Sequence, residues 1–228
     1  AILSIPSMQP EDAGLYRVEV TNSEGSALSR PIGLGLVDNP LESWSWRNPR
    51  PQGRDIVDLL AEDDVIFALT KGPNSNLLRS IDTEVWQVVN LPGEEDYLYS
   101  MAYGNGTYVI VGHNPETFAN EHPVLVSTDG VNWTKYLKPF SGSSLSKVTF
   151  ANGTFVAKAG DRRLWRSTDG VNWVQAGKTY IEQLVSGNGR FVASRHYSKD
   201  LYTSTNGWSW TKSTINTVFP YPGELHFA

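Results

Sequence analysis

Apolar and polar residues alternate along most of the chain in short runs, and turn-forming residues separate these runs. Alternation sends every second side chain to one face, which is typical of half-buried β-strands. Asn-Gly or Asp-Gly stands between many of the runs, and both dipeptides favour tight hairpins because Gly tolerates a positive φ. The pattern therefore predicts an all-β fold built from short antiparallel strands.

One seven-residue stretch organises the chain. It reads Ser-Thr-Asp-Gly-Val-Asn-Trp at 127–133 and at 167–173, returns altered at 204–210, and has a degraded copy at 80–86. Ser and Asp can bind backbone amides of the turn, and the Trp opens the return strand with a large apolar surface. Each copy is predicted to be a turn followed by a packing anchor. The motif residues are Ser80, Asp82, Trp86, Ser127, Asp129, Gly130, Trp133, Ser167, Asp169, Gly170, Trp173, Ser204, Asn206, Gly207 and Trp210.

A second signature, Asn-Gly-x-aromatic-Val, precedes three of the copies, at 105–109, 152–156 and 188–192. Four strands in roughly 40 residues is the period of a propeller blade. The sequence predicts four four-stranded blades of a partial β-propeller, at about 55–90, 91–137, 138–176 and 177–212, and the start of a next blade at 213–228. A strand at 44–48 is expected to close the ring, after a linker at 38–43.

The first 37 residues follow a different pattern. Asp12-x-Gly14-x-Tyr16 resembles the tyrosine corner of an immunoglobulin-like domain of the intermediate type, and Asn22-x-x-Gly25 resembles the turn between its last two strands. That family carries a cysteine where this chain has Val18. The resemblance implies the C-terminal part of a β-sandwich at 1–37. A generic hairpin is the alternative.

The heptad resembles the Asp-box, or bacterial neuraminidase repeat, whose common form is Ser-x-Asp-x-Gly-x-Thr-Trp. Here Gly follows Asp directly, and Asn132 or Asn172 stands where the family has Thr. The resemblance covers about 44–228 and implies a propeller, but the family includes sialidases and other glycoside hydrolases, sortilin-type receptors and a photosystem assembly factor, so it does not define an activity. The box aspartates are expected to fasten turns, and the tryptophans to pack between blades.

Composition limits the kinds of partner and of site that the chain can have. The formal net charge of −5 argues mildly against nucleic acid, and no apolar run approaches the roughly 18 residues of a membrane span. The absence of cysteine excludes disulfides and cysteine-based metal sites. Because the sequence begins without Met and in mid-pattern, it is interpreted as a fragment of a larger bacterial protein.

Candidate chemistry lies in the loops opposite the Asp-Gly and Asn-Gly hairpins, where propeller ligands commonly bind. The candidate ligand-face residues are His113, Glu116, His122, Arg162, Arg163, Arg195, His196 and Tyr197. A glycosidase needs two carboxylates about 5–9.5 Å apart, and Glu95 with Glu116 is the pair considered for that role. The spacing of His113 and His122 matches no standard zinc motif. No catalytic residues, metal or cofactor are assigned.

Three functions remain open. The favoured hypothesis is a non-catalytic extracellular or cell-surface binding or adhesion module that presents its loops to a glycan or protein partner. The first alternative is a sialidase-like or polysaccharide-degrading glycoside hydrolase whose catalytic residues lie partly outside the fragment. The second is a protein assembly scaffold that binds through its arginines.

Overall fold

The computed structural model describes residues 14–23, 25–29, 32–34, 55–72, 75–93, 96–116, 121–140, 143–176, 181–195 and 198–214. Every helix or strand within these ranges is a β-strand, which confirms the predicted all-β class. The chain divides into two compact units, Ala1–Trp46 and Arg47–Ala228.

The first unit contains two strand pairs. β1 (Gly14–Tyr16) pairs antiparallel with β4 (Ile32–Leu34), and β2 (Glu19–Asn22) forms a hairpin with β3 (Gly25–Leu28). The Gly25 amide donates to Asn22 Oδ1 over 3.1 Å, so the hairpin lies at the expected Asn-x-x-Gly turn. The side chains of Val18, Val20 and Leu28 are 64%, 66% and 61% exposed. Asp12 lies outside the described residues, and the immunoglobulin-like assignment stays a prediction.

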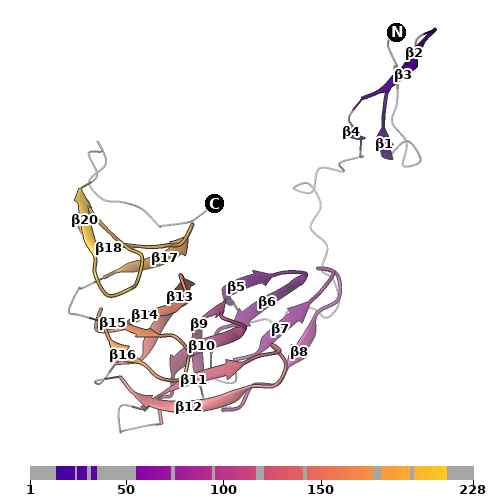
Figure 1. The fold of residues 1–228 in the computed structure, drawn as a ribbon. Helices are drawn as coiled ribbons and strands as arrows, with labels where there is room; N and C mark the ends of the chain where they lie inside the picture. Colours follow the sequence, from indigo (N-terminus) through magenta and orange to yellow (C-terminus); the bar gives the residue numbers. More distant parts are fainter. Residues whose placement is uncertain are drawn as a thin grey trace. The chain divides into compact units, whose positions relative to one another are not determined.

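The second unit contains four antiparallel sheets of four strands, each a meander in chain order (Figure 1). We call them blades 1 to 4, and they confirm the predicted propeller-type architecture. Blade 1 holds β5 (Ile56–Glu62), β6 (Val65–Thr70), β7 (Leu77–Ser80) and β8 (Gln87–Val89); blade 2 holds β9 (Tyr97–Gly104), β10 (Thr107–His113), β11 (Glu121–Ser127) and β12 (Thr134–Pro139); blade 3 holds β13 (Leu145–Ala151), β14 (Thr154–Ala159), β15 (Leu164–Ser167) and β16 (Val174–Gln175); blade 4 holds β17 (Gln183–Gly187), β18 (Arg190–Ser194), β19 (Asp200–Ser204) and β20 (Thr211–Thr214).

The predicted ends of the last blade differ slightly from the structure. Asp200 pairs with Thr214 and Leu201 with Ser213, so residues 213 and 214 belong to β20 of blade 4 and not to the start of a next blade. The rest of the expected next blade (215–228) and the expected closing strand (44–48) lie outside the described residues.

The heptad turn is held by its own side chains. In blade 2 the Ser127 hydroxyl donates to Asp129 Oδ1 over 2.9 Å and accepts from the Gly130 amide at 2.9 Å. Asp129 Oδ1 in turn accepts from the amides of Val131 (2.8 Å) and Asn132 (2.7 Å). Corresponding bonds recur at 167–172 and, with Asn206 in place of Asp, at 204–209. Local hydrogen bonds of this kind fix the turn independently of its surroundings.

The turn also positions the tryptophan. Trp133 Nε1 donates to the Gly130 carbonyl oxygen over 3.2 Å, and Trp173 Nε1 donates to that of Gly170 over 2.8 Å. Each indole is half-buried and packs against a hydrophobic cluster drawn from its own blade and the preceding one. Trp210 packs in the same way on the cluster between blades 3 and 4.

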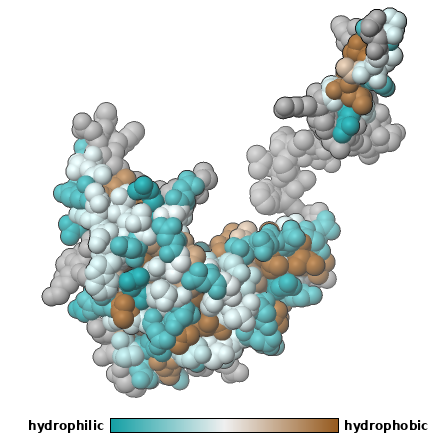
Figure 2. All heavy atoms as spheres, in the orientation of Figure 1, coloured by the Kyte–Doolittle hydropathy of each residue, from teal (hydrophilic) through white to brown (hydrophobic). Residues whose placement is uncertain are grey.

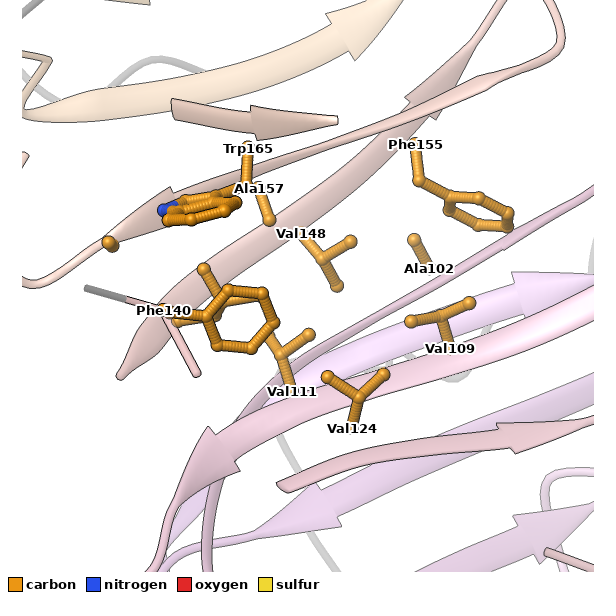
Figure 3. Close-up of a cluster of buried hydrophobic side chains, with 11 residues drawn as sticks. Ala102, Val109, Val111, Val124, Phe140, Val148, Phe155, Ala157 and Trp165 are labelled. Atoms are coloured by element: carbon orange, nitrogen blue, oxygen red, sulfur yellow. The ribbon is translucent and has the colours of Figure 1, made fainter. Parts of the chain in front are cut away.

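Successive blades pack through apolar side chains from their facing surfaces. Figure 3 shows the cluster between blades 2 and 3, where Val111 and Val124 approach Val148 and Phe155. Phe140, from the connection between the two blades, meets Trp165 edge-on with ring centroids 5.1 Å apart. On the face shown in Figure 2, apolar residues form separate brown patches among hydrophilic ones.

The Asn-Gly hairpins join the blades on the same face as the heptad turns. Asn105, in a left-handed conformation with φ of 50°, donates through Nδ2 to the carbonyl oxygens of Gly153 (3.1 Å) and Thr168 (3.2 Å) in blade 3. Asn152 makes the corresponding bonds to blade 4, to the carbonyl oxygens of Gly189 and Thr205. Both types of hairpin therefore share one face, as predicted, and the loops between second and third strands lie on the other.

We predict that Gly170→Ala destabilises the protein far more than Gly106→Ala. Both glycines have left-handed φ, 76° and 70°, so the backbone penalty is similar. An added Cβ at Gly170 would lie 2.5 Å from Val109 Cγ2 of the preceding blade, whereas at Gly106 it would meet nothing within 4 Å. Urea unfolding should show an extra loss of about 1–3 kcal/mol for Gly170→Ala, the usual cost of overpacking. Equal losses would mean that the blades do not pack on this glycine.

Candidate functional site

A groove runs along the first strands of the four blades, which we call the inner strands. β5, β9, β13 and β17 each form one edge of their sheet, and consecutive members of this series contact one another. The groove has a volume of about 940 Å³ and is lined by residues of all four strands and by Lys158 of β14. Its walls are mixed in character, because apolar side chains such as Leu60 and Val185 alternate with charged and polar ones.

One polar network links the first strands of three blades along the groove. Asp58 Oδ2 on β5 accepts from the Ser100 hydroxyl (2.7 Å) and from the Met101 amide (2.8 Å) on β9. Lys147 Nζ on β13 forms an ion pair with Asp58 Oδ1 at 3.1 Å. The fully buried Ser100 hydroxyl also accepts from the Val148 amide at 3.2 Å. The bonds to the Asp58 carboxylate are charge-assisted and so stronger than neutral ones, and together with the Ser100–Val148 bond they tie blades 1, 2 and 3 together.

The network occupies equivalent positions in the repeat. Asp58, Ser100, Lys147 and Gln183 each stand five residues before the left-handed residue that opens the first hairpin of their blade. Every blade therefore contributes one polar side chain from this position, in a strand that is otherwise largely apolar. None of these residues stands out in the sequence on its own, although aligning the first strands of the four blades on their hairpins reveals the polar position.

A second set of charges lies where blades 3 and 4 meet. Lys158 Nζ donates to the Glu182 carbonyl oxygen over 2.8 Å, and burial lowers the pKa of Lys158 from its ordinary value. Arg162 Nε forms an ion pair with the Glu182 carboxylate at 3.4 Å. The two groove-lining carboxylates, Asp58 and Glu182, are thus each bound to a cation.

The predicted loop arginines are held by local partners. Arg163 Nε pairs with Asp161 at 3.0 Å, and Arg195 lies over the ring of Tyr202, 5.4 Å from its centroid. Together with the pair between Arg162 and Glu182, these contacts spread the arginines over blades 3 and 4. His196 and Tyr197 lie outside the described residues, so their part in the predicted loop set is not described.

In blade 2, strands β10 and β11 bring two of the predicted residues together. His113 and His122 face each other with their Nδ1 atoms 3.4 Å apart. Glu116 is exposed, and its amide donates to Asn114 Oδ1 over 2.8 Å. Glu95, which was considered with Glu116 as a carboxylate pair, lies outside the described residues. The neighbouring Asp96 is buried and forms an ion pair with Lys135 at 2.6 Å.

The heptad aspartates use their carboxylates within the turn. Hydrogen bonds from the Asn132 side chain and backbone, followed by the Val131 amide, hold the pKa of Asp129 well below its ordinary value. Partial burial would raise the pKa of Asp169, but hydrogen bonds from the Asn172 backbone and side chain and the Val171 amide outweigh it and lower the pKa to about 2. Neither carboxylate lines the groove. Within the described ranges, no group of three His, Cys, Asp or Glu side chains could hold a metal ion.

Four meandering sheets arranged around a groove lined by their first strands define a β-propeller-like protein. No protein-family model matches the chain, and a search of curated proteins found no match. Across the described residues, no helix is long and apolar enough to cross a membrane.

Solved structures support the propeller fold. The chain is similar to YCF48 bound to a D1 peptide (TM-score 0.53, 21% identity, 71% of this chain and 56% of that one). It is also similar to virginiamycin B lyase from Staphylococcus aureus (0.58, 14%, 89% and 64%) and to the GH74 enzyme of Niastella koreensis (0.53, 18%, 72% and 25%). The chain therefore spans less than two thirds of each of these proteins, and at these identities the similarity concerns the fold alone.

We predict that the stability lost in Asp169→Asn depends on pH. The folded pKa of about 2 lies below the unfolded value of about 3.9, so the carboxylate stabilises the fold above pH 4 and loses this effect as pH falls towards 2. Asn206 makes the equivalent backbone bonds in blade 4, which shows that the turn accepts Asn. In urea unfolding, the gap between wild type and variant should be widest near pH 6 and should shrink towards pH 2. A gap that stays constant would contradict the prediction.

Proposed function

We propose that the protein is a non-catalytic binding module that holds an extended segment of a protein partner in the groove along its inner strands. The proposal refines the favoured hypothesis from the sequence, moving the binding surface from the loops to the groove. The observation that carries it is the bridging of β5, β9 and β13 by Asp58, Ser100 and Lys147, which makes the groove wall rigid. A preorganised wall loses little conformational entropy when a ligand binds.

The polarity of the groove supports a polypeptide as the ligand. The side chain of Lys147 is 39% exposed and carries three N–H donors. It can therefore keep its ion pair with Asp58 and also donate to an oxygen atom of a ligand. Gln183, at the equivalent position of blade 4, adds an amide that both donates and accepts. Peptide backbones and acidic side chains offer acceptors of this kind. The YCF48 structure, in which a propeller protein binds a peptide, is a precedent for the mode of binding only.

A glycoside hydrolase is the second candidate, favoured by the similarity to the GH74 enzyme and to an exo-β-1,3-galactanase from Phanerochaete chrysosporium. Hydrolysis requires one carboxyl group that donates a proton and another that acts as base or nucleophile. Both carboxylates lining the groove are instead paired with cations. This arrangement favours binding over catalysis for the described part of the groove.

The expected location and the scaffold alternative are proposed together with this function. A location outside the bacterial cell or on its surface rests on the resemblance of residues 1–37 to an immunoglobulin-like module and of the heptads to the Asp-box. The assembly scaffold is a version of the same proposal, since it also binds a protein. It differs in using Arg162, Arg163 and Arg195, which already have the local contacts described above.

We predict that Lys147→Ala weakens binding of a peptide partner about tenfold, the effect of losing roughly 1.4 kcal/mol of binding free energy. Peptide and glycan arrays probed with the purified protein would supply the ligands, and isothermal titration calorimetry would give their affinities. Lys212→Ala is the matched control. Lys212 also forms an ion pair, with Asp200 at 2.8 Å, but on the outer strand of blade 4.

The outcomes separate the candidates. Peptide binding that Lys147→Ala weakens and Lys212→Ala leaves unchanged supports the proposal. Binding to glycans but not to peptides on the arrays would show that the ligand is a glycan and not a peptide. Cleavage of a bound glycan would establish the hydrolase instead. If both substitutions weaken peptide binding equally, the binding site is not in the groove. Thermal unfolding of both variants should be recorded so that lost affinity is not confused with lost folding.

A further inference from the structure

His113 and His122 are neighbours on adjacent strands of blade 2. His113 is the last residue of β10 and His122 the second residue of β11, and these strands pair antiparallel up to Val111 and Val124. The imidazole rings lie with centroids 5.3 Å apart and planes inclined by 43°. Their Nδ1 atoms are 3.4 Å from each other. Strand pairing therefore brings together two residues that the sequence separates by a loop.

Two imidazole nitrogens at this distance need something between them. If both carry lone pairs, the lone pairs repel, so either a proton or a cation must bridge them. Zinc–nitrogen bonds are about 2.0–2.1 Å, and two ligands of a tetrahedral site are therefore about 3.3–3.4 Å apart. The observed separation fits a hydrogen bond, and it also equals the distance expected between two ligand atoms of one metal ion.

We infer that His113 and His122 form a binding site for a late first-row divalent cation such as Zn²⁺ or Ni²⁺, bound through both Nδ1 atoms. Imidazole nitrogen is a preferred ligand of these ions, whereas Mg²⁺ and Ca²⁺ prefer oxygen. The site is independent of the groove and of the function proposed for it.

The surroundings determine how strong such a site can be. His122 is buried and held within the sheet, while His113 is half-buried and leaves a path to solvent. Among the described residues, no third His, Cys, Asp or Glu joins the two histidines in a metal-binding group, so the inferred site has two protein ligands there. Lys138, paired with His122 on β12, and Tyr97, paired with His113 on β9, flank the two ligands. A site with two protein ligands holds an exchangeable ion and leaves positions open for a ligand atom from outside.

The test is calorimetric titration of the whole protein with ZnCl₂ and NiCl₂, with MgCl₂ as the negative control. Wild type should bind one ion, and His113→Ala should weaken binding by at least tenfold. His226→Ala, which removes another of the four imidazoles of the chain, should leave the affinity unchanged. His113 is the primary target because its partial exposure makes its loss tolerable for folding. His122→Gln, with its thermal unfolding recorded, is the second variant.

A spectroscopic readout separates ligation from a structural effect. In ¹⁵N-histidine spectra, Zn²⁺ should shift the Nδ1 resonances of two imidazoles, and His113→Ala should abolish both shifts. Zinc binding that is unchanged in His113→Ala would overturn the inference, because the ion would then be bound elsewhere. Absence of zinc and nickel binding in wild type would also overturn it and would show that the pair is joined by a hydrogen bond alone.

Discussion

The fold depends on the contact between the heptad glycine and the preceding blade. Gly130, Gly170 and Gly207 are buried, and the space that a side chain would need is occupied by Phe67, Val109 and Val156 of the neighbouring second strands. The carbonyl oxygen of each of these glycines accepts the indole N–H of the tryptophan three residues later. One residue thus sets the distance between blades and the position of the indole that fills the cluster between them.

The degraded copy in blade 1 separates two roles that coincide in the other copies. Ser80 and Asp82 keep the turn bonds, and Asp82 Oδ1 accepts from the amides of Glu84 and Val85. Thr83 takes the glycine position with φ of 63° and is exposed. The Ser and Asp side chains are therefore sufficient to form the turn, at the modest cost of a left-handed non-glycine residue. Glycine is needed where another blade covers the turn.

Repetition explains why the blades could be predicted and the groove could not. The recurrence of Asp-Gly and Asn-Gly with a fixed order of strands predicted an all-β fold of four-stranded antiparallel sheets, which the structure shows. Asp58 and Lys147 are 89 residues apart and belong to different blades, so no local pattern joins them. Asp58 and Lys147 meet because the blades are arranged around one groove. A count of the repeats predicts such a contact only when the inner strands of the blades are also aligned with one another. His113 and His122 were selected as loop residues, but linear spacing says little about two positions on paired strands.

The inner strands also explain the polarity of the groove. As edge strands they present backbone amides to the neighbouring blade, and the polar position of each blade can satisfy one of them. Asp58 accepts from the Met101 amide, and Ser100 accepts from the Val148 amide one blade further on. Lys147 stands at the next equivalent position but has no acceptor, so its side chain cannot bind the corresponding amide of blade 4. It turns back to Asp58 instead. The series of acceptors at this position therefore ends between blades 2 and 3, and Lys147 instead adds N–H donors to a groove wall that also carries the Glu182 carboxylate, so a carbonyl or carboxylate oxygen of a ligand would find its donor at Lys147.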